Sequence, residues 1–147
     1  MVIKTRDFGD MEISEDGIVK FAEPILGFET HTDFVLLYDD EMGEVFTWVQ
    51  SIDDSEICFI AVAPTLIDAE YSPVLPKSAR KALGLANGEE PIYLVITVIT
   101  PCLADATANL KSPIAINPKN NKAMQVVLDE DYPVRALLLQ PEEDAKC

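Results

Sequence analysis

Short apolar runs separated by polar turn residues make up most of the chain, and this spacing is typical of β-strands. The runs are rich in β-branched and aromatic side chains, which suit the pleated surface of a sheet. Ile92–Thr100 (IYLVITVIT) shows the pattern most clearly, with β-branched residues at most positions. The predicted strands are Val2–Arg6, Gly17–Phe21, Phe34–Tyr38, Val45–Gln50, Ile57–Ala63, Ile92–Thr100, Ile114–Asn117, Met124–Leu128 and Val134–Leu139.

One segment, Lys77–Leu85, has the composition of a helix instead. It follows a proline and contains good helix formers, and Asn87-Gly88 supplies a stop signal. Its apolar stripe would consist of Leu75, Ala79, Ala82 and Leu83. We therefore predict a mainly β chain: one antiparallel, barrel-like domain over residues 1–140 with a short helix near residues 77–85, and a polar tail over residues 141–147.

The chain is strongly acidic, and the charge is unevenly distributed. It has 26 acidic and 11 basic residues, for a net charge of −15. Residues 1–60 hold 15 acids and 3 bases, a net −12, whereas residues 61–147 carry only −3. This field argues against direct binding to nucleic acid or to an anionic membrane, since both need basic residues. It would attract and orient a basic partner, although it also serves solubility.

Candidate catalytic or metal-binding chemistry is sparse. His31 is the single histidine and lies in a polar connection, and Cys58, Cys102 and Cys147 match no compact metal motif. We expect Cys58 to be a core residue, and we predict no cofactor and no metal. The paired acids fall where hairpin turns are expected; a small hydrolase working through two carboxylates stays open as an alternative.

Compartment signals point to the cytoplasm. The start, MVIKTRD, lacks the apolar region of a signal peptide, and the apolar stretch around Ile92–Ile99 is too short to cross a bilayer as a helix. Cysteines without a disulfide-like pattern suit a reducing environment.

One block of the sequence has a more distinctive pattern than the rest. Thr107–Pro118 (TANLKSPIAINP) is followed by Gln125 before a short apolar run, and this resembles the C-terminal signature of FliW, the flagellar assembly factor family of many bacteria. Ile25–Glu29 and Trp48–Ser51 resemble two further family motifs, with Glu23-Pro24 in place of the usual first glycine region. The matching residues are Gly27, Phe28, Gln50, Ser51, Asn109, Leu110, Pro113, Ile114, Asn117 and Gln125.

The resemblance implies a non-enzymatic, cytoplasmic, barrel-like protein. The simplest expectation for its oligomeric state is a monomer when unbound. Proteins of this family bind flagellin, and they also bind CsrA, a basic RNA-binding translational regulator, opposing its repression of flagellin synthesis. Competition between the two partners forms a mass-action switch. We expect most signature residues to be scaffold, because Asn109 and Asn117 suit turns and Pro113 suits the start of an edge strand.

Two kinds of partner contact follow as hypotheses. Acidic turns would face CsrA, chiefly Asp39, Asp40, Glu41 and Glu44, or Asp129, Glu130 and Asp131. Flagellin would occupy a hydrophobic groove or add a strand at an open edge, for which Ile114–Ile116 is the candidate. The acidic turns within residues 39–56 should outweigh the cluster at residues 129–131. An alternative is an acidic nucleic-acid mimic that blocks a different basic protein.

Overall fold

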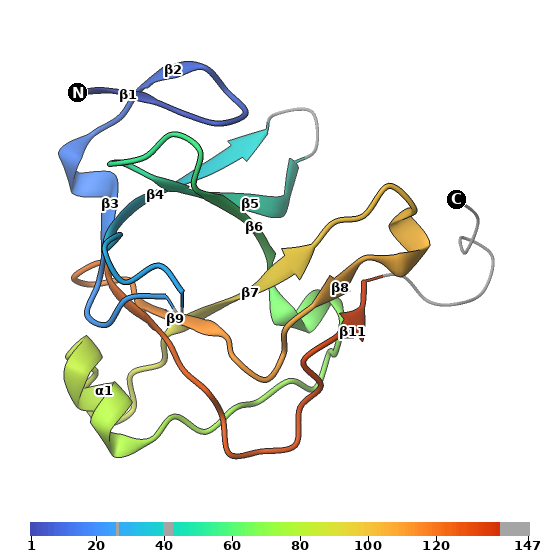
Figure 1. The fold of residues 1–147 in the computed structure, drawn as a ribbon. Helices are drawn as coiled ribbons and strands as arrows, with labels where there is room; N and C mark the ends of the chain where they lie inside the picture. The colour runs from blue at the N-terminus through green and yellow to red at the C-terminus, as the bar shows by residue number, and fades with distance from the viewer. Residues whose placement is uncertain (26, 40–42, 139–147) are drawn as a thin grey trace.

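Seven strands close into a mixed β-barrel with one short helix against it (Figure 1). The computed structural model describes residues 1–25, 27–39 and 43–138, without the side chains of Gly43, Glu44 and Leu103. The strands are β1 Val2–Lys4, β2 Asp10–Glu12, β3 Ile18–Phe21, β4 Asp33–Asp39, β5 Gly43–Ser51, β6 Cys58–Val62, β7 Ile92–Val98, β8 Thr107–Ala108, β9 Ile114–Asn117, β10 Lys122–Gln125 and β11 Ala136–Leu137. The helix is α1, Lys77–Leu83, and short 3₁₀ turns occupy Glu15–Gly17, Pro64–Leu66 and Leu103–Asp105.

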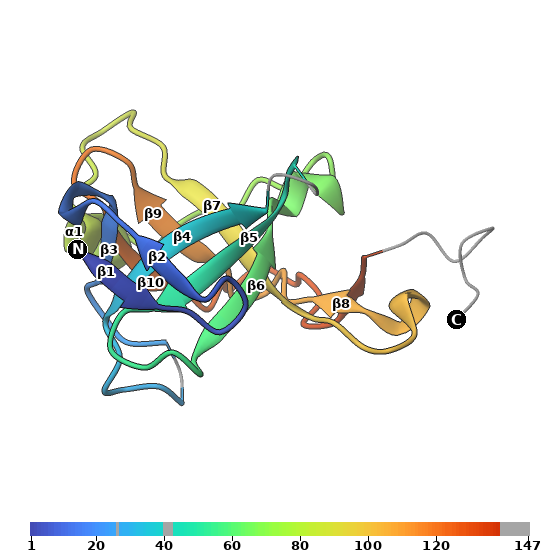
Figure 2. The ribbon, with the colours of Figure 1, turned by 90° about the horizontal axis from the view of Figure 1, so that it is seen from above.

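The barrel runs in the order β7-β6-β5-β4-β3-β10-β9 and closes because β9 pairs back onto β7. Every neighbouring pair is antiparallel except β3 and β10, which run parallel. The prediction of a mainly β, barrel-like fold with one short helix is therefore confirmed, with one parallel pairing added. β8, β11 and the last two residues of β7 form a separate short sheet, here called the arm, which projects from the barrel (Figure 2).

A hairpin formed by β1 and β2 lies over the outer face of β4 and β5 (Figure 2). On these strands alternate side chains face opposite ways. Phe34 and Val49 enter the barrel core, whereas Val35, Leu37 and Trp48 pack outward against the hairpin residues Ile3 and Ile13. Because both faces are covered, runs such as FVLLY are continuously apolar and do not alternate with polar residues.

The helix packs its buried residues Ala79 and Leu83 against a core cluster beside β10. It ends at Gly84, whose φ of 73° gives the left-handed conformation that closes many helices. The predicted stop at Asn87-Gly88 is therefore too late by one turn. The carbonyl of Leu83, in the last turn of the helix, accepts a hydrogen bond from the side-chain amide of Asn117 at 2.8 Å. This bond connects the end of the helix to β9.

Most predicted strands are confirmed, and the exceptions are short or polar. Two strands, β2 and β8, were not predicted. β2 is a polar segment that pairs only with β1, and β8 has two residues, so neither contains an apolar run that would have indicated a strand. β10 ends at Gln125, earlier than the predicted strand Met124–Leu128, because the next amides bond to a loop: Val126 N–H donates to the Pro113 carbonyl. Only Ala136–Leu137 of the last predicted strand pairs, and Leu139 and the predicted tail lie outside the described residues.

No helix in the described ranges has the length and apolar character required to span a membrane.

Candidate functional site

An open hollow of about 650 Å³ lies where the arm meets the barrel. Its apolar floor includes Phe28 and Phe59, whose rings meet edge to face at 5.0 Å. Phe28 comes from the loop after β3, where Gly27 adopts a φ of 88° and Phe28 N–H bonds to the Ile25 carbonyl. The full lining is Ile25, Phe28, Phe59, Ile96, Val98, Asp105, Thr107, Asn109, Ser112, Gln125, Val134 and Arg135.

The rim of this hollow is shaped by the family-like block. The side-chain oxygen of Asn109 accepts hydrogen bonds from the backbone N–H groups of Lys111 and Ser112, both at 3.1 Å, and so closes an Asx turn. Gln125 donates to the Ser112 carbonyl at 3.3 Å. These contacts fix a polar rim above an apolar floor, an arrangement that suits a segment with apolar side chains.

Gln50 and Ser51 are buried and hold three segments together. The Gln50 side-chain oxygen accepts from Arg6 N–H at 2.9 Å, and its amide donates to carbonyls of the β5–β6 turn, including that of Ser55. The Ser51 hydroxyl accepts from the Asp53 and Asp54 amides in the same turn. This pair therefore fixes the N-terminal segment and the turn on β5.

The predicted open edge at Ile114–Ile116 is wrong. β9 pairs with β10 on one side and with β7 on the other, so it has no free edge. Ile114 is only 1 % exposed and lies inside the barrel, with Leu110 and Pro113 also buried. Pro113 can lie directly before β9 because the N–H group that a proline lacks is not needed for pairing at that position.

The described parts of the two predicted acidic clusters, Asp39 and residues 129–131, belong to different parts of the fold. The chain around residue 130 follows the lower edge of Figure 1, whereas the β4–β5 hairpin points to the upper right. Asp129 and Asp131 are exposed, but the Glu130 carboxylate accepts the Val74 N–H at 3.1 Å and is thus part of the scaffold. Asp39 is half-buried; Asp40, Glu41 and the Glu44 side chain lie outside the described residues.

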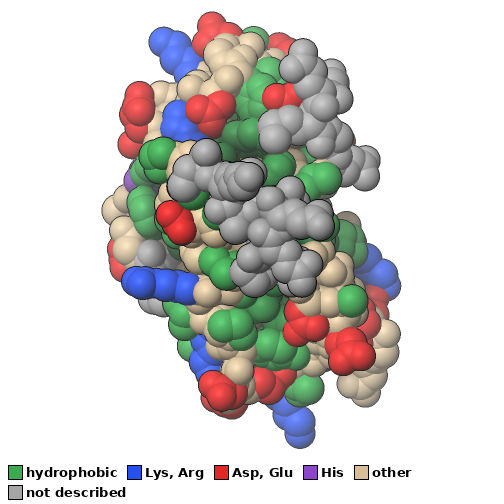
Figure 3. Space-filling model, turned by 90° about the vertical axis from the view of Figure 1, so that its right-hand side faces the viewer, with side chains coloured by type: hydrophobic (Ala, Val, Ile, Leu, Met, Phe, Trp, Pro, Cys, Tyr) green, Lys and Arg blue, Asp and Glu red, His purple; other side chains and the backbone are tan. Residues whose placement is uncertain are grey.

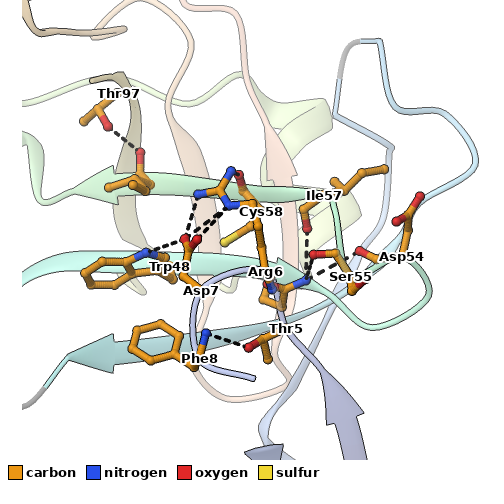
Figure 4. Close-up of polar contacts among 12 residues, drawn as sticks. Thr5, Arg6, Asp7, Phe8, Trp48, Asp54, Ser55, Ile57, Cys58 and Thr97 are labelled. Atoms are coloured by element: carbon orange, nitrogen blue, oxygen red, sulfur yellow. Dashed lines mark hydrogen bonds and ion pairs between the residues drawn. The ribbon is translucent and has the colours of Figure 1, made fainter. Parts of the chain in front are cut away.

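A polar cluster that the sequence did not indicate joins the N-terminal segment to β6 (Figure 4). Arg6 forms an ion pair with Asp7 at 2.9 Å and donates from Nη1 to the Cys58 carbonyl at 2.8 Å. Asp7 also accepts from the Trp48 indole at 3.1 Å. The hydrogen bond to Asp7 raises the pKa of Arg6. Burial raises the pKa of the Cys58 thiol to about 11, so Cys58 is a neutral core thiol as expected.

Nothing among the described side chains assembles a reactive centre. No group of three His, Cys, Asp or Glu residues within the described ranges could hold a metal. His31 is half-buried in its loop, with its Nδ1 atom unpartnered. Burial raises the pKa of Tyr71 well above its usual range and that of Tyr93 to about 12, and the Tyr71 hydroxyl donates to the Leu110 carbonyl at 2.7 Å. These tyrosines therefore act as packing residues.

Exposed apolar side chains gather on the arm and on the chain directly beside it. Val98, Ile99, Val134 and Leu137 are each more than two-fifths exposed. Hydrophobic side chains also reach the surface between acidic ones on the side of the molecule that Figure 3 presents. Clustered apolar side chains are uncommon on a surface that faces only solvent. This part of the surface is therefore suited to contact with a protein partner.

Comparison with known proteins is consistent along the whole described chain. The family model described as FliW protein matches residues 2–138. The flagellar assembly factor FliW of Syntrophus aciditrophicus is 38% identical over 144 residues, covering 97% of this chain and 90% of the relative. That of Thermotoga neapolitana is 36% identical over 148 residues, covering 99% and 98%.

A solved structure titled as the crystal structure of the flagellar assembly factor FliW superposes with a TM-score of 0.86 at 30% identity, covering 97% of this chain and 100% of that one. The signature block, the seven-stranded barrel and these matches agree. The chain therefore belongs to the FliW family of non-enzymatic flagellar assembly factors.

Proposed function

We propose that this protein binds flagellin and antagonises the translational regulator CsrA in the cytoplasm, and so couples flagellin synthesis to export. The observation that carries the proposal is the family match over residues 2–138, nearly the whole described chain. Free protein would hold CsrA away from flagellin messenger RNA. Accumulated flagellin would occupy the protein and release CsrA, so the switch would operate by mass action and without catalysis.

The charge supports the CsrA part of the proposal. An RNA-binding regulator presents positive potential, and a chain of net charge −15 attracts it and repels competing RNA. The acidic turns within residues 39–56 are the preferred contact, and the exposed Asp129 and Asp131 are the second. Glu130 is not included among the proposed contact residues, because its carboxylate already accepts a hydrogen bond from the Val74 N–H.

The apolar hollow supports the flagellin part. A flagellin segment awaiting export offers apolar side chains, and the floor formed by Phe28, Phe59 and Ile96 would receive them. The buried Ile114 has no part in this contact. The polar rim at Asn109 and Gln125 would set the orientation of the bound segment.

A three-component competition tests the proposal with purified protein, CsrA, flagellin and labelled flagellin leader RNA. We expect the protein to release RNA from CsrA, and added flagellin to restore the CsrA–RNA complex. Release of RNA that flagellin does not reverse would refute the coupling. Binding to an unrelated basic protein with no affinity for CsrA would instead support the nucleic-acid mimic.

A further inference from the structure

One face of the arm forms a wall of the open hollow, and the strand register identifies this face. Val98 pairs with Thr107, and Thr107 pairs with Leu137, so these three side chains lie in one row. The alternate row faces the other way, because Ala108 and Ala136 pack in the core cluster that the helix covers. Val98 and Thr107 line the hollow, so the arm presents this face to whatever occupies it.

Several polar side chains around the hollow have hydrogen-bonding groups without a partner in the described chain. The Thr107 and Ser112 hydroxyls make no hydrogen bond there, and Arg135 makes neither a hydrogen bond nor an ion pair. The side-chain nitrogen of Asn109 is also unused, because the Asx turn engages only its oxygen. All four groups can donate, so the rim of the hollow offers more donors than acceptors.

The charge of the hollow differs from that of the molecule. Its charged lining residues are Arg135 and Asp105, so the lining is neutral in a chain of net charge −15. Asp129 and Asp131 precede Arg135 in the sequence but do not line the hollow. A guanidinium presents its donors in the planar geometry that matches a carboxylate. A carboxylate in the hollow would therefore meet a cation and neutral donors beside an apolar floor.

We propose that the flagellin segment received by the hollow carries an aspartate or glutamate whose carboxylate pairs with Arg135 and accepts from the side-chain amide of Asn109. The inference rests on the proposed function, because flagellin is the occupant assigned there to the hollow. Apolar side chains of the segment lie on the floor formed by Phe28 and Phe59, and the carboxylate lies on the side of the arm.

This pairing lets the hollow distinguish between segments of similar hydrophobicity. A segment that covers the rim displaces water from the Asn109 amide and the Arg135 guanidinium. A carboxylate replaces that water as the acceptor, whereas an apolar side chain leaves both donors unpaired and a basic one is repelled by Arg135. Selection therefore depends on one acidic residue beside apolar ones.

Asn109→Asp tests the rim without removing the turn. Its carboxylate can still accept from the Lys111 and Ser112 N–H groups, but it no longer donates, and it places a negative charge beside the bound carboxylate. We expect the affinity for full-length flagellin, measured by calorimetric titration, to fall about tenfold. Asn87→Asp is the matched control, because Asn87 is exposed and does not line the hollow. It should change affinity less than about twofold, and equal losses in the two variants would overturn the proposal.

Arg135→Glu tests the ion pair by exchange of charges. It should weaken flagellin binding about tenfold or more, whereas Lys122→Glu, an equal charge change at an exposed base outside the hollow, should have less than about a twofold effect. Aspartates and glutamates of flagellin are then replaced by lysine one at a time. One replacement should weaken binding to the parent chain and recover most of the affinity lost by Arg135→Glu. If no flagellin carboxylate is coupled to position 135 in this way, the proposal is wrong.

The outcomes separate this inference from the proposed function. Because Arg135 is exposed and unpaired in the described part of the free chain, Arg135→Glu should keep the Tm of the parent, so lost binding does not reflect unfolding. If the parent binds flagellin and both rim variants behave like their controls, the carboxylate pairing is overturned and flagellin binding stands. If the parent does not bind flagellin, both are overturned.

Discussion

The β9 side of the barrel and the start of β6 are built in opposite ways. β9 is paired on both edges and all four of its residues are buried, and it carries the centre of the FliW-like signature. Cys58, at the start of β6, pairs with β5 on one edge, and its carbonyl accepts from the Arg6 side chain on the other at 2.8 Å. The signature residues of β9 therefore hold the barrel closed, whereas the signature residues Asn109 and Gln125 lie on the rim of the open hollow that is proposed to receive a partner.

The sharpest test of the closed side is Ile114→Lys. The variant places an ammonium group where the side chain is 1 % exposed, with no acidic partner in the surrounding apolar cluster. We expect a loss of about 4 kcal/mol or more in the free energy of unfolding, enough to leave much of the chain unfolded. Urea denaturation followed by circular dichroism measures it.

Ile92→Lys is the matched control, because Ile92 pairs with Ile116 across the same β7–β9 junction but is half exposed. We expect it to cost less than about 1 kcal/mol. If both variants lost the same free energy of unfolding, a lysine anywhere at the β7–β9 junction would be destabilising. Burial of Ile114 would then not explain the loss.

Gln50→Ala tests the polar anchor that connects the closed barrel to the N-terminal segment. It removes the acceptor for Arg6 N–H and leaves carbonyls of the β5–β6 turn without their donor in a buried site. We expect a loss of about 2–3 kcal/mol, measured by the same denaturation. Gln125→Ala, at a half-buried position on the rim of the hollow, should cost less than half as much; equal losses would remove the distinction between anchor and rim.

Sequence patterns predicted the closed side better than the contacts at the start of β6, for physical reasons. Ile114–Asn117 was delimited correctly because a proline and an asparagine bound its apolar run. That β9 has no free edge, and that β10 runs parallel to β3, depend on contacts between distant segments, which periodicity does not contain. The Arg6–Asp7–Trp48 cluster was missed because Trp48 lies far along the chain from the adjacent Arg6 and Asp7, and the three match no known motif. Gln50 and Asn117 were singled out by resemblance alone.

Alkaline pH tests the burial of Cys58 at the start of β6. In the folded chain the pKa of its thiol is raised from 9.0 to about 11, mainly by burial. Stability from the neutral thiol is therefore complete below pH 9.0 and is lost as the pH rises to about 11, since only the unfolded thiol ionises in that window. We expect a loss on the order of 1 kcal/mol.

The measurement compares unfolding free energies of the parent and Cys58→Ala across that window. The variant removes the thiol, so its curve should be flatter between pH 9.0 and about 11. Tyr93, with its pKa raised to about 12, affects both proteins alike. Curves of equal slope would show that Cys58 ionises in the folded chain as readily as in the unfolded one.

The smallest stability effect, and the most direct test of the acidic surface, comes from two matched charge reversals. Asp53→Lys with Glu56→Lys, and Asp129→Lys with Asp131→Lys, replace two exposed acids each and change the net charge equally. Neither should alter unfolding free energy by more than about 0.5 kcal/mol. The first pair lies in residues 1–60, which hold most of the excess negative charge, so it should slow the proposed association with CsrA more and lower the salt dependence of that association further. Stopped-flow measurements at several salt concentrations give both the association rate and its salt dependence.

Equal salt dependences for the two pairs of reversals would mean that net charge alone steers the partner. A larger effect at Asp129 and Asp131 would instead assign the contact to that cluster.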